Sequence, residues 1–167
     1  MSRRKSKRQF LVKLVIGMAV AVVAMSYLGT YWRIGLDVQT IRCLPWSVYA
    51  IHRTDPTPER GALMAFHARG LAPKIADGTL LVKIIAAVPG DHIAVDAAGI
   101  RINGNFWGPL NDRALAYWGK AERSAYRSLT LKAGHYLMLG TEPMSYDGRY
   151  WGQVEAQQFV GHAYPIW

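Results

Sequence analysis

The segment Thr79-Leu80-Leu81-Val82-Lys83-Ile84-Ile85-Ala86-Ala87-Val88 is the strongest predictor of the fold. It places one charged residue inside a long apolar strand pattern. The turn sequence Pro89-Gly90-Asp91 follows and ends the strand. Apolar residues flank Lys83 on both sides, which favours a strand packed on both of its faces. An amine in such a place is desolvated, and desolvation favours its neutral, basic form. The alternative is a lysine on a solvent-facing strand edge, and the stretch by itself leaves both interpretations open.

Short strand patterns surround this stretch. Turn signals separate them at intervals of about 8–12 residues, a spacing typical of an all-β barrel or sandwich. Residues 108–132 are polar and mixed, and we expect an insertion or flap there, with a short helix near 113–123. The predicted fold is therefore mainly β, an antiparallel domain. Its other expected strands cover residues 48–51, 62–66, 92–95, 100–104, 136–139 and 158–164.

The beginning of the chain joins a basic tail to an apolar run. Six positive residues precede residue 14 with no acid among them, so the rest of the chain carries only 14 basic against 11 acidic residues. A net charge of +9 therefore says little about nucleic-acid binding, because its excess is concentrated where positive charge sets membrane orientation. The six residues are Arg3, Arg4, Lys5, Lys7, Arg8 and Lys13.

The apolar run predicts a membrane anchor. About 20 residues cross a bilayer core, and we expect the span at residues 10–32, behind a basic cytoplasmic tail at 1–9. Residues 33–167 then form a periplasmic, β-rich domain attached to the inner membrane by a single pass. The alternative is a cleavable signal peptide with a weak site at Ala24-Met25-Ser26. The run continues past that site into aromatic residues, which favours the uncleaved anchor.

Cys43 is the only cysteine, so it has no partner within the chain for a disulfide. A free thiol in an exported domain is either a buried, inert small hydrophobe or a nucleophile. The residues around it bear on this choice.

Four motifs follow one another behind the apolar segment, at residues 43–49, 60–66, 81–91 and 145–152. Their content and order resemble the type I signal peptidase superfamily, and most closely its conjugative-transfer branch, the TraF-type peptidases. The ending at 161–167 is also similar to that branch. The resemblance covers nearly all of the exported domain and implies a signal-peptidase-like β domain with peptidase activity.

The resemblance also implies roles for individual residues. Cys43 stands at the nucleophile position, Lys83 at that of the general base, and Ser145 at that of a hydroxyl that orients the lysine amine. Asp147 and Arg149 match an ion pair that holds the last motif. The implied supporting positions are Pro45, Pro89, Gly90, Asp91, Asp147 and Arg149.

Of the positions that depart from the family pattern, two bear on the chemistry. Cys43 replaces serine, and because sulfur is the better nucleophile, Lys83 acts either as base or as counter-ion to a thiolate. Ile41 stands where some relatives have a hydroxyl that donates to the oxyanion, which leaves the backbone N–H of Cys43 as donor. A Cys–His arrangement, with His52 as the nearest base in sequence, is the alternative to the lysine.

We predict a membrane-anchored endopeptidase that processes an exported precursor through a thioester acyl-enzyme. By resemblance the substrate is the prepilin of a conjugative type IV secretion system, and whether water or the substrate's own N-terminus resolves the thioester stays open. The alternatives are a catalytically silent assembly protein and a general signal peptidase. No histidines have metal-ligand spacing, so we expect no metal or cofactor. The expected partners are the precursor and inner-membrane lipid, without nucleic acid, and the oligomeric state is not predicted.

Overall fold

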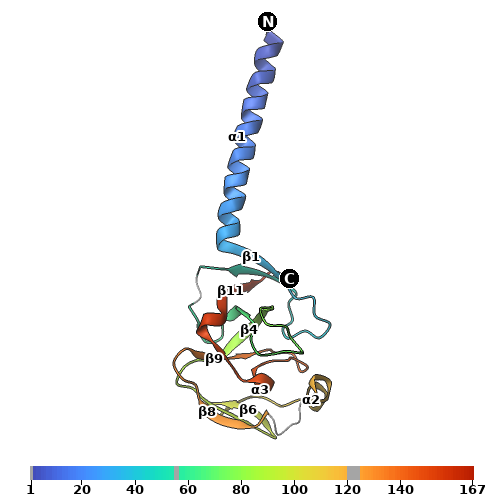
Figure 1. Ribbon diagram of the computed structural model, residues 1–167, viewed down its shortest axis with the longest axis vertical. Helices are drawn as coiled ribbons and strands as arrows, with labels where there is room; N and C mark the ends of the chain where they lie inside the picture. The colour runs from blue at the N-terminus through green and yellow to red at the C-terminus, as the bar shows by residue number, and fades with distance from the viewer. Residues whose placement is uncertain (1, 55–56, 120–124) are drawn as a thin grey trace.

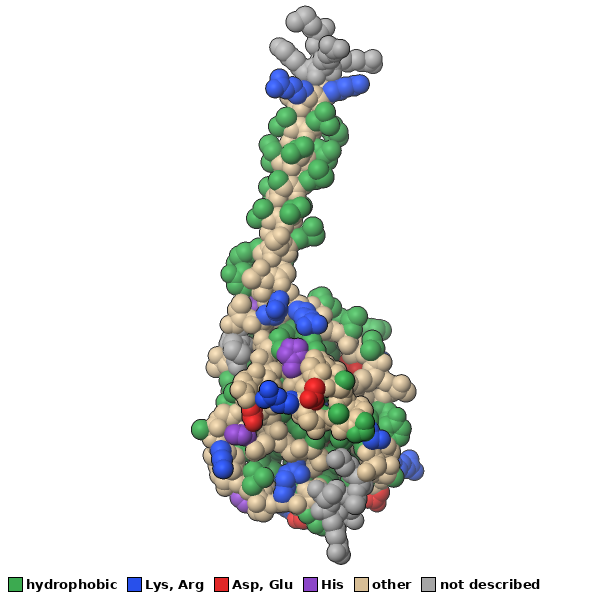
Figure 2. All heavy atoms as spheres, in the orientation of Figure 1, with side chains coloured by type: hydrophobic (Ala, Val, Ile, Leu, Met, Phe, Trp, Pro, Cys, Tyr) green, Lys and Arg blue, Asp and Glu red, His purple; other side chains and the backbone are tan. Residues whose placement is uncertain are grey.

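The structure is a computed structural model that describes residues 2–54, 57–119 and 125–167. A long helix, α1 (Ser2–Tyr31), stands away from a β-rich domain (Figure 1). Its segment Lys7–Tyr31 contains an 18-residue stretch with a mean hydropathy of 2.2 and is long and apolar enough to cross a membrane. Figure 2 shows hydrophobic side chains along the exposed length of this helix. The helix fits a single-pass anchor, although a signal sequence has the same character.

The helix passes into the first strand without a linker. Trp32, expected to end the anchor, already begins strand β1 (Trp32–Leu36), which the strand patterns did not predict. The backbone N–H of Arg53 donates to the Tyr31 carbonyl at 2.8 Å, and its guanidinium donates to the Gly29 carbonyl at 3.4 Å. The end of α1 is therefore tied to the loop that follows β2.

Seven antiparallel strands form the larger sheet, in the order β1-β2-β11-β3-β4-β9-β10. The long apolar stretch is β4, and it lies between β3 and β9, as an apolar strand packed on both faces should. The remaining strands are β2 (Val48–His52), β3 (Leu63–His67), β4 (Leu80–Ala87), β9 (His135–Leu139), β10 (Gln153–Glu155) and β11 (Phe159–Pro165).

Four strands form the second sheet, in the order β7-β6-β5-β8, again antiparallel. They are β5 (His92–Asp96), β6 (Gly99–Ile102), β7 (Asn105–Gly108) and β8 (Arg127–Thr130). The expected flap at 108–132 thus contributes a strand of this sheet, β8, together with the short helix α2 (Asp112–Trp118). Helix α2 is shorter than the helix expected at 113–123, of which residues 120–124 lie outside the described residues.

Apolar clusters join the two sheets and pack both faces of β4. One cluster connects the end of β4 and strand β9 to the second sheet. A second lies on the face of β4 that carries Leu81 and Ile85, and a third lies on the face of Leu80, Val82 and Ile84. The hydrophobic effect drives such burial, so β4 forms the centre of the domain. Two short helices complete the fold, α3 (Gly148–Trp151) and the 3-10 helix η2 (Ala156–Gln158).

Candidate active site

Lys83 lies in the middle of β4 with its side chain on an apolar face. It is 1% exposed, and its partner across the strand pair is the fully buried Met64. Leu81 and Ile85 flank it on the same face because side chains alternate along a strand. The solvent-facing alternative is therefore wrong, and the amine lies in the desolvated setting that the strand pattern predicted.

Ser145 lies next to this amine. Lys83 Nζ donates to Ser145 Oγ at 3.4 Å, and Ser145 is fully buried. The backbone N–H of Ser145 donates to the Glu142 carbonyl at 3.0 Å, which closes a turn after β9. Ser145 is thus a turn residue whose hydroxyl contacts the lysine.

The same loop also holds Cys43. The Cys43 carbonyl accepts hydrogen bonds from the backbone N–H groups of Thr141 at 3.0 Å and Glu142 at 3.3 Å. Gly140 packs so closely that a Cβ there would overlap both the Cys43 carbonyl oxygen and Ser145 Oγ. Residues 140–145 therefore connect the backbone of the nucleophile candidate to the hydroxyl beside the lysine.

A buried ion pair fixes this loop from behind. Arg149 donates to Asp147 through Nε at 2.9 Å and through Nη2 at 2.6 Å, a bidentate geometry. The same two side chains bind both backbone groups of Gly140. Asp147 Oδ2 accepts from its N–H at 2.9 Å, and Arg149 Nη2 donates to its carbonyl at 3.2 Å. The pair thus sets the position of the glycine that packs on Cys43 and Ser145.

The electrostatics of this pair extend to the thiol. Burial disfavours the charged form of Arg149, but the hydrogen bonds and charge of Asp147 outweigh it and hold the pKa of Arg149 above its ordinary value. A negative charge on Cys43 contributes in the same direction. A thiolate at Cys43 would therefore lie in the field of a buried guanidinium as well as near Lys83.

The segment from Cys43 to β2 is anchored at its far end by Tyr49. Its hydroxyl donates to the Trp46 carbonyl at 2.9 Å, and burial is the main cause that raises the pKa of Tyr49 to about 12. The phenol therefore stays neutral and remains a donor. Pro45, expected to support the site, is exposed within the bend between Leu44 and Trp46.

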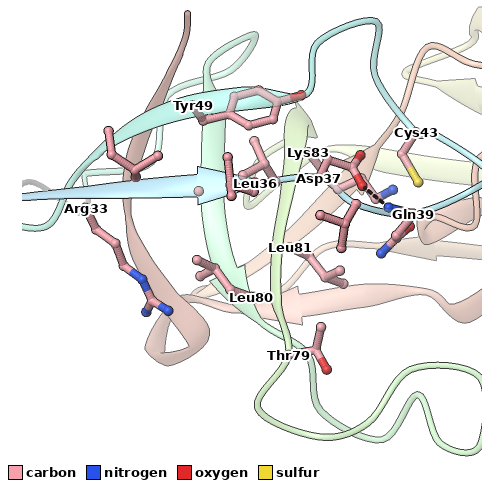
Figure 3. A pocket seen from close by; sticks show the side chains of 14 residues that line it. Arg33, Leu36, Asp37, Gln39, Cys43, Tyr49, Thr79, Leu80, Leu81 and Lys83 are labelled. Carbon is pink, nitrogen blue, oxygen red and sulfur yellow. Dashed lines mark hydrogen bonds between the residues drawn. The ribbon is translucent and has the colours of Figure 1, made fainter. Parts of the chain in front are cut away.

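Cys43 and Lys83 line one cavity of about 310 Å³ (Figure 3). One wall is the chain from Arg33 to Gln39, which begins with β1, and the opposite wall runs from Thr79 to Lys83 along β4. Figure 3 shows the Cys43 sulfur and the Lys83 side chain at the same end of this cavity. Cys43 itself is 7% exposed. The cavity thus leads along two strand segments to the thiol.

The nucleophile candidate keeps a free backbone donor. Within residues 2–54, 57–119 and 125–167, nothing accepts a hydrogen bond from the Cys43 N–H. His52, the alternative base, is on the face of β2 opposite to Tyr49 and Ile51. Its ring packs against that of Trp32, with a distance of 4.7 Å between the ring centroids. It is not among the residues that line the cavity. The geometry therefore favours Lys83 over His52 as the partner of Cys43.

The turn after β4 holds three of the expected supporting residues, Pro89, Gly90 and Asp91, which do not line the cavity. Asp91 accepts from the Val88 N–H at 2.8 Å, from Asn103 Nδ2 at 2.7 Å and from Arg60 Nη2 at 2.8 Å. Pro89 and Gly90 form the exposed tip of this turn, where Gly90 has a φ of +92°. Asp91 thereby connects the turn that follows β4 to Arg60, which precedes β3, and to Asn103 in the turn between β6 and β7.

Two parts of the site did not follow from the sequence patterns. Gly140 was not singled out, although a glycine directly after the apolar residues 136–139 is a signal for a tight turn. The wall formed by residues 33–39 was also missed, because Gly35 and Asp37 interrupt the strand pattern there. Only the pairing of β1 with β2 shows that this segment faces β4 across the cavity.

Comparison with known proteins gives one family match, two similar relatives and one similar solved structure. The signal peptidase family, peptidase S26, matches residues 7–167. The plasmid transfer protein TraF of Escherichia coli is 28% identical over 90% of this chain and 90% of its own length. A probable signal peptidase I-2 of Synechocystis is 28% identical over 64% of this chain and 47% of its own length. A solved signal peptidase I of Enterococcus faecalis V583 is 24% identical, with a TM-score of 0.42 over 65% of this chain and 98% of that one.

The family match includes the apolar helix, both sheets and every residue of the site described above. Together with a relative that is similar along almost its full length, it shows that this chain belongs to the signal peptidase family, peptidase S26, in its TraF-type branch.

Proposed function

We propose that this protein is a membrane-anchored endopeptidase whose nucleophile is Cys43, with Lys83 as its proton acceptor or counter-ion and Ser145 as the group that orients Lys83. The observation that carries the proposal is the single cavity that contains both the thiol and the buried amine, with Ser145 Oγ 3.4 Å from that amine. A thiol and a desolvated amine form a nucleophile–base pair.

The proposed reaction has two steps. The Cys43 sulfur attacks the scissile carbonyl carbon, the C–S bond forms, and the C–N bond breaks as the thiol proton passes by way of Lys83 to the leaving amine. Water then attacks the thioester carbonyl carbon, a C–O bond forms and the C–S bond breaks, and one proton of that water passes by way of Lys83 to the thiolate, which restores the thiol. The Cys43 N–H donates to the oxyanion in both steps, without help from Ile41.

We propose that the substrate is an exported precursor of a conjugative apparatus, a prepilin. The support is the similarity to a plasmid transfer protein along nine-tenths of both chains. The basic residues before the apolar helix favour a cytoplasmic N-terminus, which would place residues 33–167 in the periplasm. Similarity to a probable signal peptidase I-2 supports the second candidate, a general signal peptidase, over a shorter part of the chain.

One cellular experiment tests these proposals together. The wild type, Cys43→Ala, Cys43→Ser and Lys83→Met are each expressed with a conjugative prepilin and, separately, with an ordinary secretory precursor. We expect the wild type to process the prepilin and Cys43→Ala to process neither. Full processing by Cys43→Ala would end the nucleophile proposal, and processing of the secretory precursor alone would replace the prepilin by general substrates. Processing that survives Lys83→Met but not Cys43→Ala would assign the base to another residue.

A further inference from the structure

Helix α2 contacts the loop of Ser145 at both ends of the helix. At its beginning, the backbone N–H of Asn111 donates to the Tyr150 hydroxyl at 3.3 Å, while the Asn111 side chain caps the helix by accepting from the Ala114 N–H. At its end, Trp118 packs against the residues around Ser145. The short helix therefore packs against residues 144–150, where Ala114 and Leu115 share an apolar cluster with Tyr146 and Tyr150.

Trp118 contacts the neighbours of Ser145 on both sides along the chain. Its indole Nε1 donates to the Met144 carbonyl at 3.2 Å. Its ring stacks on Tyr146 with a centroid distance of 4.6 Å and an interplanar angle of 24°. Aromatic pairs in this geometry contribute beyond their buried area. One side chain thus fixes the residue before Ser145 through its backbone and the residue after it through its ring.

The hydrogen bond between Lys83 and Ser145 tolerates little movement of this loop. At 3.4 Å, the contact between Lys83 Nζ and Ser145 Oγ is close to the distance at which a hydrogen bond is lost. A shift of the loop by a few tenths of an ångström away from β4 would break it. Since Ser145 is fully buried, water cannot easily take the place of the hydroxyl.

We propose that Trp118 is a positioning residue, which acts from helix α2 to hold Ser145 within hydrogen-bond distance of Lys83. The inference rests on the proposed roles of Lys83 and Ser145. It assigns a role in the site to the region 108–132, because this region supplies the support behind the residue that orients the amine.

The test uses the reactivity of Cys43, which needs no substrate. Since Cys43 is the only cysteine, alkylation of the full chain in detergent micelles reports on this thiol alone. The rate with iodoacetamide is measured against pH for the wild type, Lys83→Met, Trp118→Ala, Trp118→Phe, Ser145→Ala and the double variant Trp118→Ala/Ser145→Ala. Trp118→Phe keeps a ring to stack on Tyr146 and removes only the N–H donor.

Two further variants separate positioning from general stability. Leu131→Ala removes a buried side chain, 3% exposed, from the apolar cluster between the two sheets, and Tyr117→Ala removes the exposed neighbour whose ring meets Trp118 edge-on at a centroid distance of 4.8 Å. Thermal unfolding of every variant is recorded beside its alkylation rate. Leu131→Ala should lower the unfolding temperature and leave the pH–rate profile unchanged, and Tyr117→Ala should leave both unchanged.

We expect Ser145→Ala and Trp118→Ala to slow alkylation near neutral pH by similar factors, roughly 10- to 100-fold. Loss of a group that orients a metal ligand through a hydrogen bond has an effect of this size, and Ser145 orients Lys83 in the same indirect way. The double variant should be no slower than Ser145→Ala, because both changes remove the same interaction. Trp118→Phe should give a smaller loss and supplies the comparison if Trp118→Ala does not fold.

Either of two outcomes would overturn the inference. In one, the folded Trp118 variants react like the wild type while Ser145→Ala is slow. In the other, Leu131→Ala changes the profile as much as Trp118→Ala at a similar loss of stability. A third result, wild-type reactivity of both Ser145→Ala and Lys83→Met, would contradict the proposed function itself and is thereby distinguished from failure of the Trp118 inference alone.

Discussion

Lys83 Nζ donates to Ser145 Oγ at 3.4 Å across 62 residues of sequence. The loop that carries Ser145 also binds the Cys43 carbonyl through Thr141 and Glu142. A central strand, a short loop and the segment before β2 therefore meet at one point. The proposal that Lys83 is the partner of the Cys43 thiol rests on this meeting point rather than on any single motif.

Removing the amine of Lys83 should abolish processing while the fold survives. Methionine matches the length of lysine and suits the apolar face beside Met64, so Lys83→Met introduces no buried charge. We expect the rate of precursor cleavage to fall by at least about 100-fold, the usual minimum for loss of a general base. The exposed Lys74→Met is the matched control and should cleave at the wild-type rate. Cleavage by Lys83→Met within a few-fold of wild type would contradict the role of the amine.

Gly140 should not tolerate even one added methyl group. A Cβ at this position overlaps the Cys43 carbonyl oxygen and Ser145 Oγ, whereas a Cβ at Gly108 meets only Arg149 Nη1 at 3.9 Å. Overpacking of this kind costs about 1–3 kcal/mol and displaces neighbouring groups. Gly140→Ala should therefore lose stability to urea and lose cleavage activity, while Gly108→Ala keeps both. Equal behaviour of the two variants would show that the close packing at Gly140 has no consequence.

The buried pair of Asp147 and Arg149 should matter far more than an exposed pair. Asp147→Asn leaves a guanidinium that is 5% exposed without its counter-ion, which costs about 3–5 kcal/mol in comparable buried pairs. Asp96→Asn breaks the pair with Arg101, whose side chains are 55% and 36% exposed, and such surface pairs contribute at most about 1 kcal/mol. Denaturant unfolding measures both variants. If Asp147→Asn lowers the free energy of unfolding by less than Asp96→Asn does, the assigned importance of the buried pair is wrong.

The turn after β4 should give the protein a pH-dependent stability in acid. The hydrogen bond from Arg60 is the main cause that lowers the pKa of Asp91 from 3.8 to about 2. Because the folded-state pKa is depressed, this stabilisation is complete well above pH 3.8 and is lost as the pH falls toward 2. The unfolding free energy of Asp91→Asn should therefore approach that of the wild type over this interval. A constant difference between the two proteins down to pH 2 would show that the carboxylate is not responsible.

The apolar strand and its lysine were predictable because they are local. The run around Lys83 has one pattern for strand and burial alike, and the turn residues after it mark its end. The nucleophile segment and the Ser145 loop were recognised by motif, since no periodicity indicates that they meet. The contact of Ser145 with Lys83 depends on β4 and β9 lying side by side in one sheet, which is a non-local pairing.

The parts that sequence patterns missed share a physical reason. Strand β1 is short and exposed on one face, and Gly35 weakens its pattern, so only its pairing with β2 defines it. Strand β8 lies in a polar region in which burial comes mainly from the opposite sheet. Trp118 is half-buried on a seven-residue helix, and its contacts with Met144 and Tyr146 span more than 25 residues. Tertiary contacts of this kind leave no periodic trace in the sequence.

The central claim is that the Cys43 sulfur carries the acyl group of the substrate. Its most direct measurement is mass spectrometry of the full chain mixed with precursor, quenched in acid at early times and digested. We predict that the peptide containing Cys43 carries the acyl fragment of the precursor as a thioester and that neutral hydroxylamine releases this fragment. Cys43→Ala should yield neither the adduct nor the product. Product formed at the wild-type rate by Cys43→Ala, with no adduct at any time, would contradict this claim.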